Sequence, residues 1–327
     1  TNDKDSGISM RKNYTFGNCK VAIIGAGFVG SSIAYALTIK DVVREIVLID
    51  INHEKVDGEV KDIRHGLPTM GITDLYDGDY SDCADCDLII ITAGRGRKSG
   101  ESRLDLTNYN IKIMESVIDS LNQYYTGGVI LIISNPVDIL TYKVTEWMNL
   151  PDGMVFGSGN ILDSSRFVRT IADYVKLSTS VINGYVVGEH GDGQVPIWSH
   201  VTVEGIPIDA YCSDVGIEWN DNIKKALTGK TKNMGSQIIA AKGCTHYGIA
   251  TCVCQLTDAI TNMKPTICSV SSVLMGEHGC RGVALSVPSV VGSSGVQQRI
   301  REKWAPEEYR GFFDAVEKSR TIIKLVS

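Results

Sequence analysis

Four residues of the chain have types that together suit proton transfer at a carbonyl group beside a carboxylate: His190, Asp163, Arg166 and Arg103. His190 lies in Gly188-Glu-His-Gly-Asp192. A histidine titrates near neutral pH, so it can donate the proton that a ketone needs when it accepts a hydride. An aspartate against the other ring nitrogen would hold the tautomer and stabilise the imidazolium, and Asp163 is the candidate.

The two arginines could supply the cations that such a reaction requires. Arg166 follows Asp163 by three residues, which places both on one side of a helix. Its guanidinium can bind a substrate carboxylate through two parallel hydrogen bonds. Arg103 follows a loop, residues 95–102, with a glycine near each end, which predicts a mobile lid that brings Arg103 to the carbonyl oxygen. Surface ion pairs for the arginines and a capping role for Asp163 are the simpler alternatives.

A glycine pattern predicts a dinucleotide site. Gly25-x-Gly27-x-x-Gly30 comes directly after an apolar run, and Asp50 follows Gly30 by 20 residues. The helix that begins there would present its N-terminus to a pyrophosphate. Asp50 should accept hydrogen bonds from ribose hydroxyls and repel a 2′-phosphate, so we predict NAD rather than NADP. A glycine-rich turn without a ligand is the alternative.

Two further positions require a choice between chemistry and structure. Asn135 ends an apolar strand before Pro136, where it is either a donor near nicotinamide and substrate or a helix cap. His278 lies in a second Glu-His-Gly triplet, between the strand-like runs Val270–Leu274 and Gly282–Ser286. A hairpin turn is its natural place, and we assign it no chemistry.

The composition excludes several classes of protein. The 327 residues carry a net charge of −6, which argues against nucleic acid as a main partner. No apolar run approaches the ~20 residues of a membrane span. Nine scattered cysteines favour a reducing cytoplasm, and small thiols explain Cys83/Cys86 and Cys252/Cys254 better than a metal site. Met10 is a candidate native start, which would set residues 1–9 apart from the native chain, and residues 1–18 are expected to form a flexible tail.

The order of apolar segments predicts an α/β fold, with a parallel sheet covered on both faces in the first half and a mixture of helices and hairpins in the second. We place the boundary near Gly157–Asn160, with domains at residues 19–157 and 158–327. Strands and helices alternate in the first half, at Lys20–Gly25, Phe28–Ile39, Glu45–Asp50, Lys55–His65, Asp87–Thr92, Leu104–Leu121 and Gly128–Ser134. The second half has long helical stretches and hairpin-like pieces, at Asp163–Tyr174, Trp219–Ala241, Tyr247–Asn262, Ser199–Pro207 and Ser269–Val287.

From about Asn18 to Ile323, the chain resembles the L-lactate/malate dehydrogenase family, and within it the lactate branch. The matching stretches are Gly25–Gly30, Thr92-Ala-Gly94, Gly100-Glu-Ser-Arg-Leu-Asp-Leu106, Ser134-Asn-Pro-Val-Asp138, Gly157-Ser-Gly, Leu162-Asp-Ser-Ser-Arg-Phe167, Gly188–Asp192 and Val195-Pro-Ile-Trp198-Ser. The resemblance implies a Rossmann-type doubly wound parallel sheet followed by a mixed α/β substrate domain. It also implies NAD as cofactor, a small 2-oxo or 2-hydroxy carboxylic acid as substrate, a place in glycolysis and pyruvate metabolism, and usually a homotetramer, with a homodimer as the alternative.

The resemblance also implies a role for each site residue. His190 would be the acid/base, Asp163 its partner, Arg103 the group that polarises the carbonyl and Arg166 the carboxylate anchor. Thr245 matches a pocket threonine of lactate enzymes, and Asn135 would contact both substrate and cofactor. The implied cofactor contacts are Gly25, Gly27, Phe28, Val29, Gly30, Asp50, Thr92, Ala93, Gly94 and Asn135.

Two positions depart from the lactate branch. Arg97 stands in the lid where that branch usually has glutamine and malate enzymes have an arginine that pairs with the second carboxylate of oxaloacetate. The resemblance along the whole chain makes L-lactate dehydrogenase the first expectation, and Arg97 makes malate dehydrogenase the alternative. Val168 and Asn183 replace the arginine and histidine of lactate enzymes that fructose 1,6-bisphosphate activates, so we predict no such activation. A nucleotide-binding sensor without activity and an enzyme for bulkier 2-oxo acids are less favoured, because the four residues are all present and the lid is polar and cationic.

Overall fold

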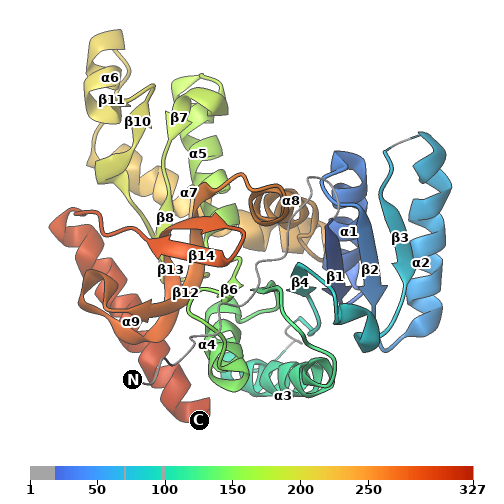
Figure 1. Cartoon of the computed structure of the whole chain (residues 1–327). Helices are drawn as coiled ribbons and strands as arrows, with labels where there is room; N and C mark the ends of the chain where they lie inside the picture. The colour runs from blue at the N-terminus through green and yellow to red at the C-terminus, as the bar shows by residue number, and fades with distance from the viewer. Residues whose placement is uncertain (1–18, 70, 97–99, 327) are drawn as a thin grey trace, which may run out of the picture.

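A large twisted sheet organises the molecule (Figure 1). The computed structural model describes residues 19–69, 71–96 and 100–326. The strands of the sheet follow the order β3-β2-β1-β4-β5-β6-β12-β13-β8-β9, and β14 pairs with β13. The first six strands pair in parallel, and β6 then meets β12 in antiparallel orientation. The predicted α/β class with a doubly wound parallel sheet is therefore confirmed.

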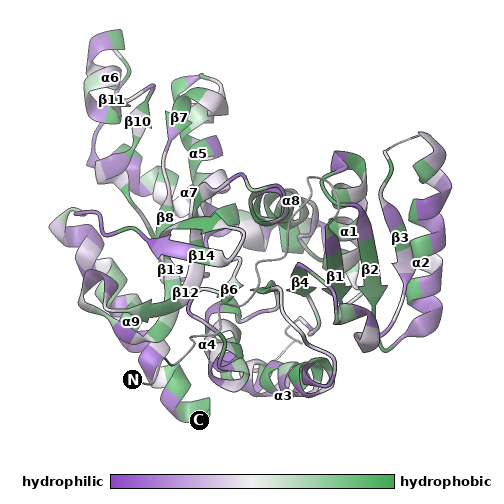
Figure 2. Cartoon of the chain, in the orientation of Figure 1, coloured by the Kyte–Doolittle hydropathy of each residue, from purple (hydrophilic) through white to green (hydrophobic). Residues whose placement is uncertain are grey.

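The parallel strands are short, and most of them are rich in buried β-branched residues. This composition fits strands that are covered on both faces. Their bounds are β1 Lys20–Ile24, β2 Glu45–Ile49, β3 Asp74–Asp77, β4 Leu88–Ile91, β5 Val129–Ile132 and β6 Val155–Gly157. In Figure 2, β1, β2 and β4 are coloured as hydrophobic, whereas β3 at the edge of the sheet is more hydrophilic.

Helices cover both faces of the parallel part. Successive strand residues point to opposite faces, so Ile23 and Ile90 pack under α1, α2 and α8, whereas Ile24 and Ile91 pack under α3 and α4. Each fully buried isoleucine contributes about 1.5–3 kcal/mol. The helices are α1 Phe28–Lys40, α2 His53–Gly66, α3 Arg103–Asn122, α4 Val137–Met148 and α8 Tyr247–Thr261.

The second half of the chain extends the sheet and adds a small one. A long hairpin of β12 and β13 packs against α9, and a three-stranded sheet of β11, β10 and β7 packs with α5 and α6. The strands are β7 Ile182–Asn183, β8 Val186–Gly188, β9 Gln194–Pro196, β10 Thr202–Val203, β11 Ile206–Pro207, β12 Thr266–Met275, β13 Arg281–Gly292 and β14 Gly295–Arg299. The remaining helices are α5 Ile161–Val175, α6 Ile208–Val215, α7 Asp221–Lys242 and α9 Pro306–Val326.

The two halves share one sheet and one core. Gly157 of β6 pairs with Ile132 of β5 and with Ser271 of β12, so the sheet continues past the residues where we placed the boundary. Helix α8 belongs to the second half but packs on the first half beside α1. This arrangement matters for function, because it brings residues from both halves to the ends of β1, β4 and β5.

In the part of the chain that the structure describes, no helix is both long and apolar enough to cross a membrane. Within the same residues, no group of three or more His, Cys, Asp or Glu side chains is arranged to hold a metal ion.

Candidate active site

The glycine pattern forms a tight turn between β1 and α1. Gly25 has φ +113°, and a Cβ there would lie 2.5 Å from the Thr92 hydroxyl. A Cβ on Gly30 would lie 1.8 Å from the carbonyl oxygen of Gly25. Gly27, by contrast, is exposed and would meet nothing within 4 Å. Two glycines are therefore required by close packing, whereas Gly27 leaves the N-terminus of α1 open to an anion.

Asp50 lies at the end of β2, directly beside this turn. Its carboxylate accepts hydrogen bonds from the backbone N–H groups of Ala26, at 2.7 Å, and Asn52, at 3.0 Å. Next to it, Ile51 is 95% exposed and offers an apolar surface. The arrangement has the elements of a dinucleotide site: an open helix N-terminus for phosphates, a carboxylate for a ribose and an apolar side chain for a base.

The ends of β4 and β5 meet at the same edge of the sheet. After β4, the Thr92 hydroxyl donates to the Gly25 carbonyl at 2.9 Å, and the Ser134 hydroxyl donates to the Ala93 carbonyl at 2.6 Å. Gly94 follows with φ +151°. These bonds join the two strand ends to the glycine turn, which is where ligands bind in sheets of this kind.

Asn135 is exposed at the end of β5, two residues before α4, whose N-cap residue is Pro136. Its Oδ1 accepts from the Val137 N–H at 3.3 Å, and its backbone carbonyl accepts from the Asn110 side chain at 2.7 Å. Its side chain therefore contacts the first turn of α4 without being the helix cap, and a contact with substrate or cofactor stays a prediction. Asn110, buried in α3, also accepts from the Arg95 N–H at 3.1 Å.

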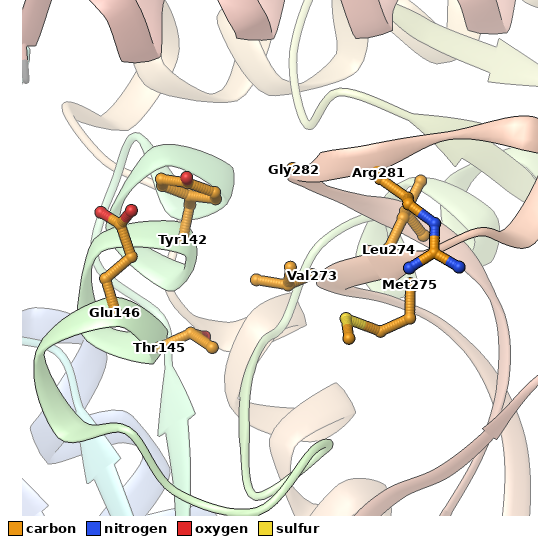
Figure 3. Close-up of a pocket in the computed structure, with 8 residues that line it drawn as sticks. All are labelled: Tyr142, Thr145, Glu146, Val273, Leu274, Met275, Arg281 and Gly282. Atoms are coloured by element: carbon orange, nitrogen blue, oxygen red, sulfur yellow. The ribbon is translucent and has the colours of Figure 1, made fainter.

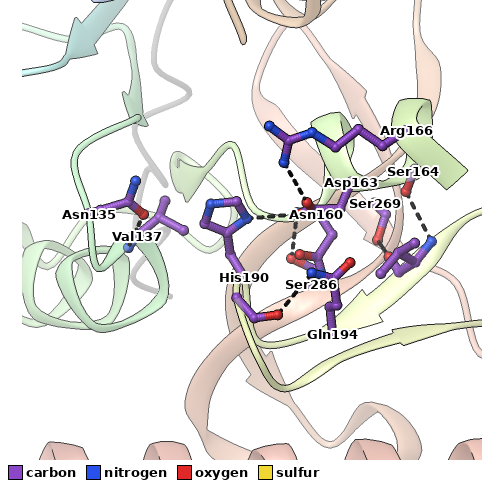
Figure 4. Close-up of polar contacts among 12 residues, drawn as sticks. Asn135, Val137, Asn160, Asp163, Ser164, Arg166, His190, Gln194, Ser269 and Ser286 are labelled. Atoms are coloured by element: carbon purple, nitrogen blue, oxygen red, sulfur yellow. Dashed lines mark hydrogen bonds and ion pairs between the residues drawn. The ribbon is translucent and has the colours of Figure 1, made fainter. Parts of the chain in front are cut away.

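His190, Asp163 and Arg166 form one contact group. Nδ1 of His190 lies 2.7 Å from Asp163 Oδ2, and Arg166 Nη1 lies 3.0 Å from Asp163 Oδ1. In Figure 4 the His190 ring lies between Asn135 on one side and Asp163 with Arg166 on the other. The Asp163 side chain is 2% exposed and that of His190 is 26% exposed. The aspartate is therefore sheltered, whereas the imidazole remains within reach of a ligand.

The charges in this group determine its protonation. Burial disfavours the imidazolium, but the charge and hydrogen bond of Asp163 outweigh it, so the pKa of His190 is raised above its usual 6.5. For Asp163, burial is outweighed by the attraction of His190 and Arg166, and the pKa of the carboxyl is lowered. Ionised Asp163 can only accept, so Nδ1 carries a proton and Nε2 is left to exchange one with a ligand.

Buried polar side chains that we did not single out hold the segment Gly188–Asp192 around His190, which we call the histidine loop. The Asn160 amide donates to the Gly188 carbonyl at 3.1 Å, and the Gln194 amide donates to the Gly191 carbonyl at 2.9 Å. Asp138 accepts from the His190 backbone N–H at 2.7 Å. Asp138 stands in the Ser134–Asp138 stretch that matches the family, which was a usable signal. Nothing local to Asn160 or Gln194 indicated their contacts.

Arg103 is the first residue of α3, and it contacts Asp192 near His190 instead of His190 itself. Its guanidinium pairs with Asp192 at 2.6 Å, and both side chains are exposed. Arg95 pairs with Glu101 at 2.5 Å and joins the two ends of the lid. Arg97, which we predicted to contact the substrate, lies outside the described residues.

Thr245 lies two residues before α8 and is partly exposed. Its neighbour His246 is bonded through Nδ1 to the Ser32 hydroxyl of α1 at 2.8 Å. Phe28, at the start of α1, stacks on His246 with ring centroids 5.7 Å apart. Thr245 is therefore held near the glycine turn, and a role in the substrate pocket stays a prediction.

The second Glu-His-Gly triplet forms the expected turn between β12 and β13. His278 stacks on Trp304 with ring centroids 4.0 Å apart, and burial lowers the pKa of its imidazole. It contacts aromatic side chains near α9 instead of a carboxylate–arginine pair. Surroundings, and not the local triplet, separate the two histidines.

Other candidate features lie away from the His190 group. A hollow of about 310 Å³ between α4 and the β12–β13 hairpin is lined mainly by apolar atoms of residues such as Val273 and Met275 (Figure 3). None of the described residues that line it belongs to the group around His190. The thiols of Cys83, Cys86, Cys252 and Cys254 are buried, and none of the four forms a disulfide.

The fold and the group around His190 define a dinucleotide-dependent dehydrogenase of the α/β class. The chain matches the lactate/malate dehydrogenase NAD binding domain over residues 19–157, and the alpha/beta C-terminal domain of the same family over residues 161–325. The chain therefore belongs to the lactate/malate dehydrogenase family, as its sequence resemblance predicted.

Relatives of the chain include several L-lactate dehydrogenases. The L-lactate dehydrogenase of Acetivibrio thermocellus is 40% identical over 289 residues, 88% of this chain and 91% of that protein. The enzyme of Priestia megaterium is 38% identical over 315 residues, 96% of this chain and 98% of that protein. The ligand-bound crystal structure of the minor L-lactate dehydrogenase of Enterococcus mundtii has a TM-score of 0.92 at 37% identity, and covers 95% of this chain and 99% of that one.

Proposed function

We propose that the protein is an NAD-dependent L-lactate dehydrogenase. This oxidoreductase reduces pyruvate with NADH to give L-lactate and NAD, and it catalyses the reverse reaction. The observation that carries this proposal is the contact group of His190, Asp163 and Arg166 at the open edge of an NAD-binding sheet. The relatives described above are L-lactate dehydrogenases, which supports L-lactate, the reduced form of pyruvate, as the substrate.

The residues around the glycine turn fit the cofactor. The N-terminus of α1 at Gly27 would face the phosphates, and Asp50 would bind a ribose. Val29, Thr92, Ala93 and Gly94 are proposed to line the same site. When bound, NAD supplies or accepts the hydride.

The chain's own residues then bind the acid and move the proton. Arg166 binds the substrate carboxylate, and the ion pair with Asp163 orients the Arg166 guanidinium for this contact. His190 donates a proton from Nε2 to the carbonyl oxygen during reduction, and Asp163 stabilises the imidazolium before transfer. Arg103 polarises the carbonyl once it leaves Asp192, and the lid of residues 95–102 excludes water.

The substrate is tested by NADH oxidation with pyruvate and with oxaloacetate in parallel. The wild type is expected to show the higher kcat/KM with pyruvate. Arg97→Gln removes the cation that would bind a second carboxylate, so it should raise the ratio of kcat/KM for pyruvate over oxaloacetate by about tenfold or more. The malate alternative depends on Arg97 alone and finds no support among the relatives described above.

A neighbouring cation provides the control for this experiment. Lys98→Gln changes the net charge of the lid by the same amount at the next position. It should leave the ratio of the two specificity constants near the wild-type value. If Arg97→Gln also leaves that ratio unchanged, Arg97 does not set the substrate. A wild type that strongly prefers oxaloacetate would overturn the proposed function.

The choice of cofactor is tested at Asp50. Asp50→Ser removes the charge that repels a 2′-phosphate, so the ratio of kcat/KM for NADH over NADPH should fall by about tenfold or more. Asp57→Ser, an exposed acid on α2 that pairs with Lys61, is the control and should not change this ratio. A wild type that prefers NADPH would contradict the assignment. Thermal unfolding of each variant shows whether the turn at Ala26 stays folded.

The finer properties are also proposals. We infer a cytoplasmic enzyme of glycolysis and pyruvate metabolism, and buried cysteines such as Cys83 and Cys252, which form no disulfide, fit a reducing compartment. A homotetramer or homodimer is supported by Phe28, Tyr35 and Ile39, exposed apolar side chains on one face of α1. We propose the division into residues 19–157 and 158–327, which the two matched family domains support.

The surroundings of Val168 support the absence of activation by fructose 1,6-bisphosphate. Val168 lines a hollow of about 680 Å³ beside α5, together with Ser164, Thr179 and Ser180. None of the described residues that line this hollow is cationic, so a sugar bisphosphate would find no charged partner among them.

A further inference from the structure

Asp138 is a buried carboxylate that contacts His190 and that the proposed mechanism does not use. It lies in the first turn of α4 and is 4% exposed. Burial raises the pKa of Asp138 to about 6, although Ser271 and the contact with His190 oppose this effect. An ionised carboxylate is costly to bury, so its presence here costs stability.

The contact is made to the backbone of the histidine and not to its ring. Asp138 Oδ2 accepts from the His190 N–H at 2.7 Å, whereas Asp163 of α5 binds Nδ1 at the same distance. Gly188 and Gly191 near His190 have φ of +87° and +133°. Glycine restricts backbone rotation less than any other residue. The His190 N–H between these two glycines therefore needs a partner of its own if the imidazole is to keep one orientation.

Helix α4 connects this contact to the rest of the site. Its first turn follows Asn135, which lies at the carboxyl edge of the parallel sheet. A bond from the first turn of α4 to the His190 backbone therefore sets the histidine relative to the end of β5. Asp163 alone sets the ring relative to α5, in the other half of the chain.

We propose that Asp138 is a positioning residue of the dehydrogenase reaction: it holds the His190 backbone so that Nε2 faces the substrate beside the ends of β4 and β5. This inference rests on the proposed function for its kinetic test. Its predicted effect on the histidine is independent of substrate.

The charges around His190 indicate a second effect. Asp163 and Asp138 favour the imidazolium, and Arg166 disfavours it. The other charged groups nearby are already paired: Glu189 with Lys318 of α9, and Asp192 with Arg103 of α3. Lys232 of α7 donates to the Asp192 carbonyl at 3.4 Å. Removing the charge of Asp138 should therefore make the imidazolium less favourable.

Asp138→Asn tests both effects, because it keeps the size but removes the charge and replaces the charge-assisted bond to the His190 N–H with a weaker neutral one. We expect kcat/KM for pyruvate to fall on the order of 10- to 100-fold, the cost of a misplaced proton donor. The midpoint of its pH profile should move down by about one pH unit. Binding of NADH, followed by fluorescence, and the midpoint of thermal unfolding should not fall.

Asn160→Ser is the matched control. It loosens the same loop at the Gly188 carbonyl without a change of charge, so it should lower kcat and leave the pH midpoint in place. Asp138→Asn with the wild-type kcat/KM and midpoint would overturn the inference. So would a loss of activity with an unchanged midpoint and a lower unfolding temperature, because that result describes a general structural role.

A substrate-free measurement separates this inference from the proposed function. The ring protons of the six histidines can be followed by NMR as pH is varied, with His190→Gln identifying the signal of His190. The His190 midpoint should be lower in Asp138→Asn than in the wild type. If the wild type does not reduce pyruvate, the proposed function fails, and this midpoint still decides whether Asp138 acts on His190.

Discussion

His190→Gln is expected to lower kcat for pyruvate reduction by about 10²- to 10⁴-fold, the usual contribution of a positioned general acid. Glutamine keeps a donor for Asp163 but cannot release a proton to the carbonyl oxygen. NADH binding should be little changed, because the glycine turn and Asp50 lie on other elements. The measurement is steady-state NADH oxidation, with NADH affinity determined separately by fluorescence.

The pH dependence of the wild type has a defined sign. Reduction needs the imidazolium, and the pKa of His190 is raised by Asp163 against the effect of burial. Reduction should therefore stay near its maximum below this raised pKa and fall as pH rises through it. Lactate oxidation needs the neutral ring and should change in the opposite direction.

The second Glu-His-Gly triplet provides the matched control for His190. His278→Gln should leave kcat near the wild-type value, because His278 stacks on Trp304 and does not join the contact group. It should instead lower the midpoint of thermal unfolding, since it removes a buried aromatic contact. Undiminished turnover in His190→Gln would refute the proposed mechanism.

Arg166→Lys is expected to raise KM for pyruvate by about 10²-fold, because the ammonium keeps the charge but loses the parallel pair of donors. A smaller fall in kcat should accompany it, since Arg166 also binds Asp163 at 3.0 Å. Gly235 of α7 lies beside the guanidinium, because a Cβ built on it would be 3.5 Å from Arg166 Nη1. Initial rates over a range of pyruvate concentrations separate the two effects.

Arg169→Lys is the control on the same helix. Arg169 lies one turn further along α5, is 66% exposed and pairs with Asp173 at 3.0 Å. The same substitution there should leave KM for pyruvate unchanged. Equal KM values for Arg166→Lys and the wild type would show that the substrate carboxylate binds elsewhere.

The predicted elements that the structure reproduces are those with a strong local pattern. The strands at Lys20–Ile24 and Leu88–Ile91 are continuous apolar runs, and α5 keeps its apolar residues on one face. Helix α4 is harder to predict because Val137–Met148 is rich in β-branched residues and largely buried, which weakens its periodicity. Strand β3 is short and begins and ends in aspartates. Helix α9 begins with Pro306 and two glutamates, a start signal that could have identified it.

The sequence by itself determined which residues are the candidates for the site. Asp163 and Arg166 share a helix face because three residues make nearly one turn, and the glycines at 25 and 30 follow from a close turn, so local geometry was sufficient for both. Tertiary structure alone decided that His190 meets Asp163, that Arg103 pairs with Asp192, and that Asp138 holds the His190 backbone. These contacts join residues far apart in the chain. They depend on how α4, α5 and the shared sheet bury one another, which no local pattern of residues encodes.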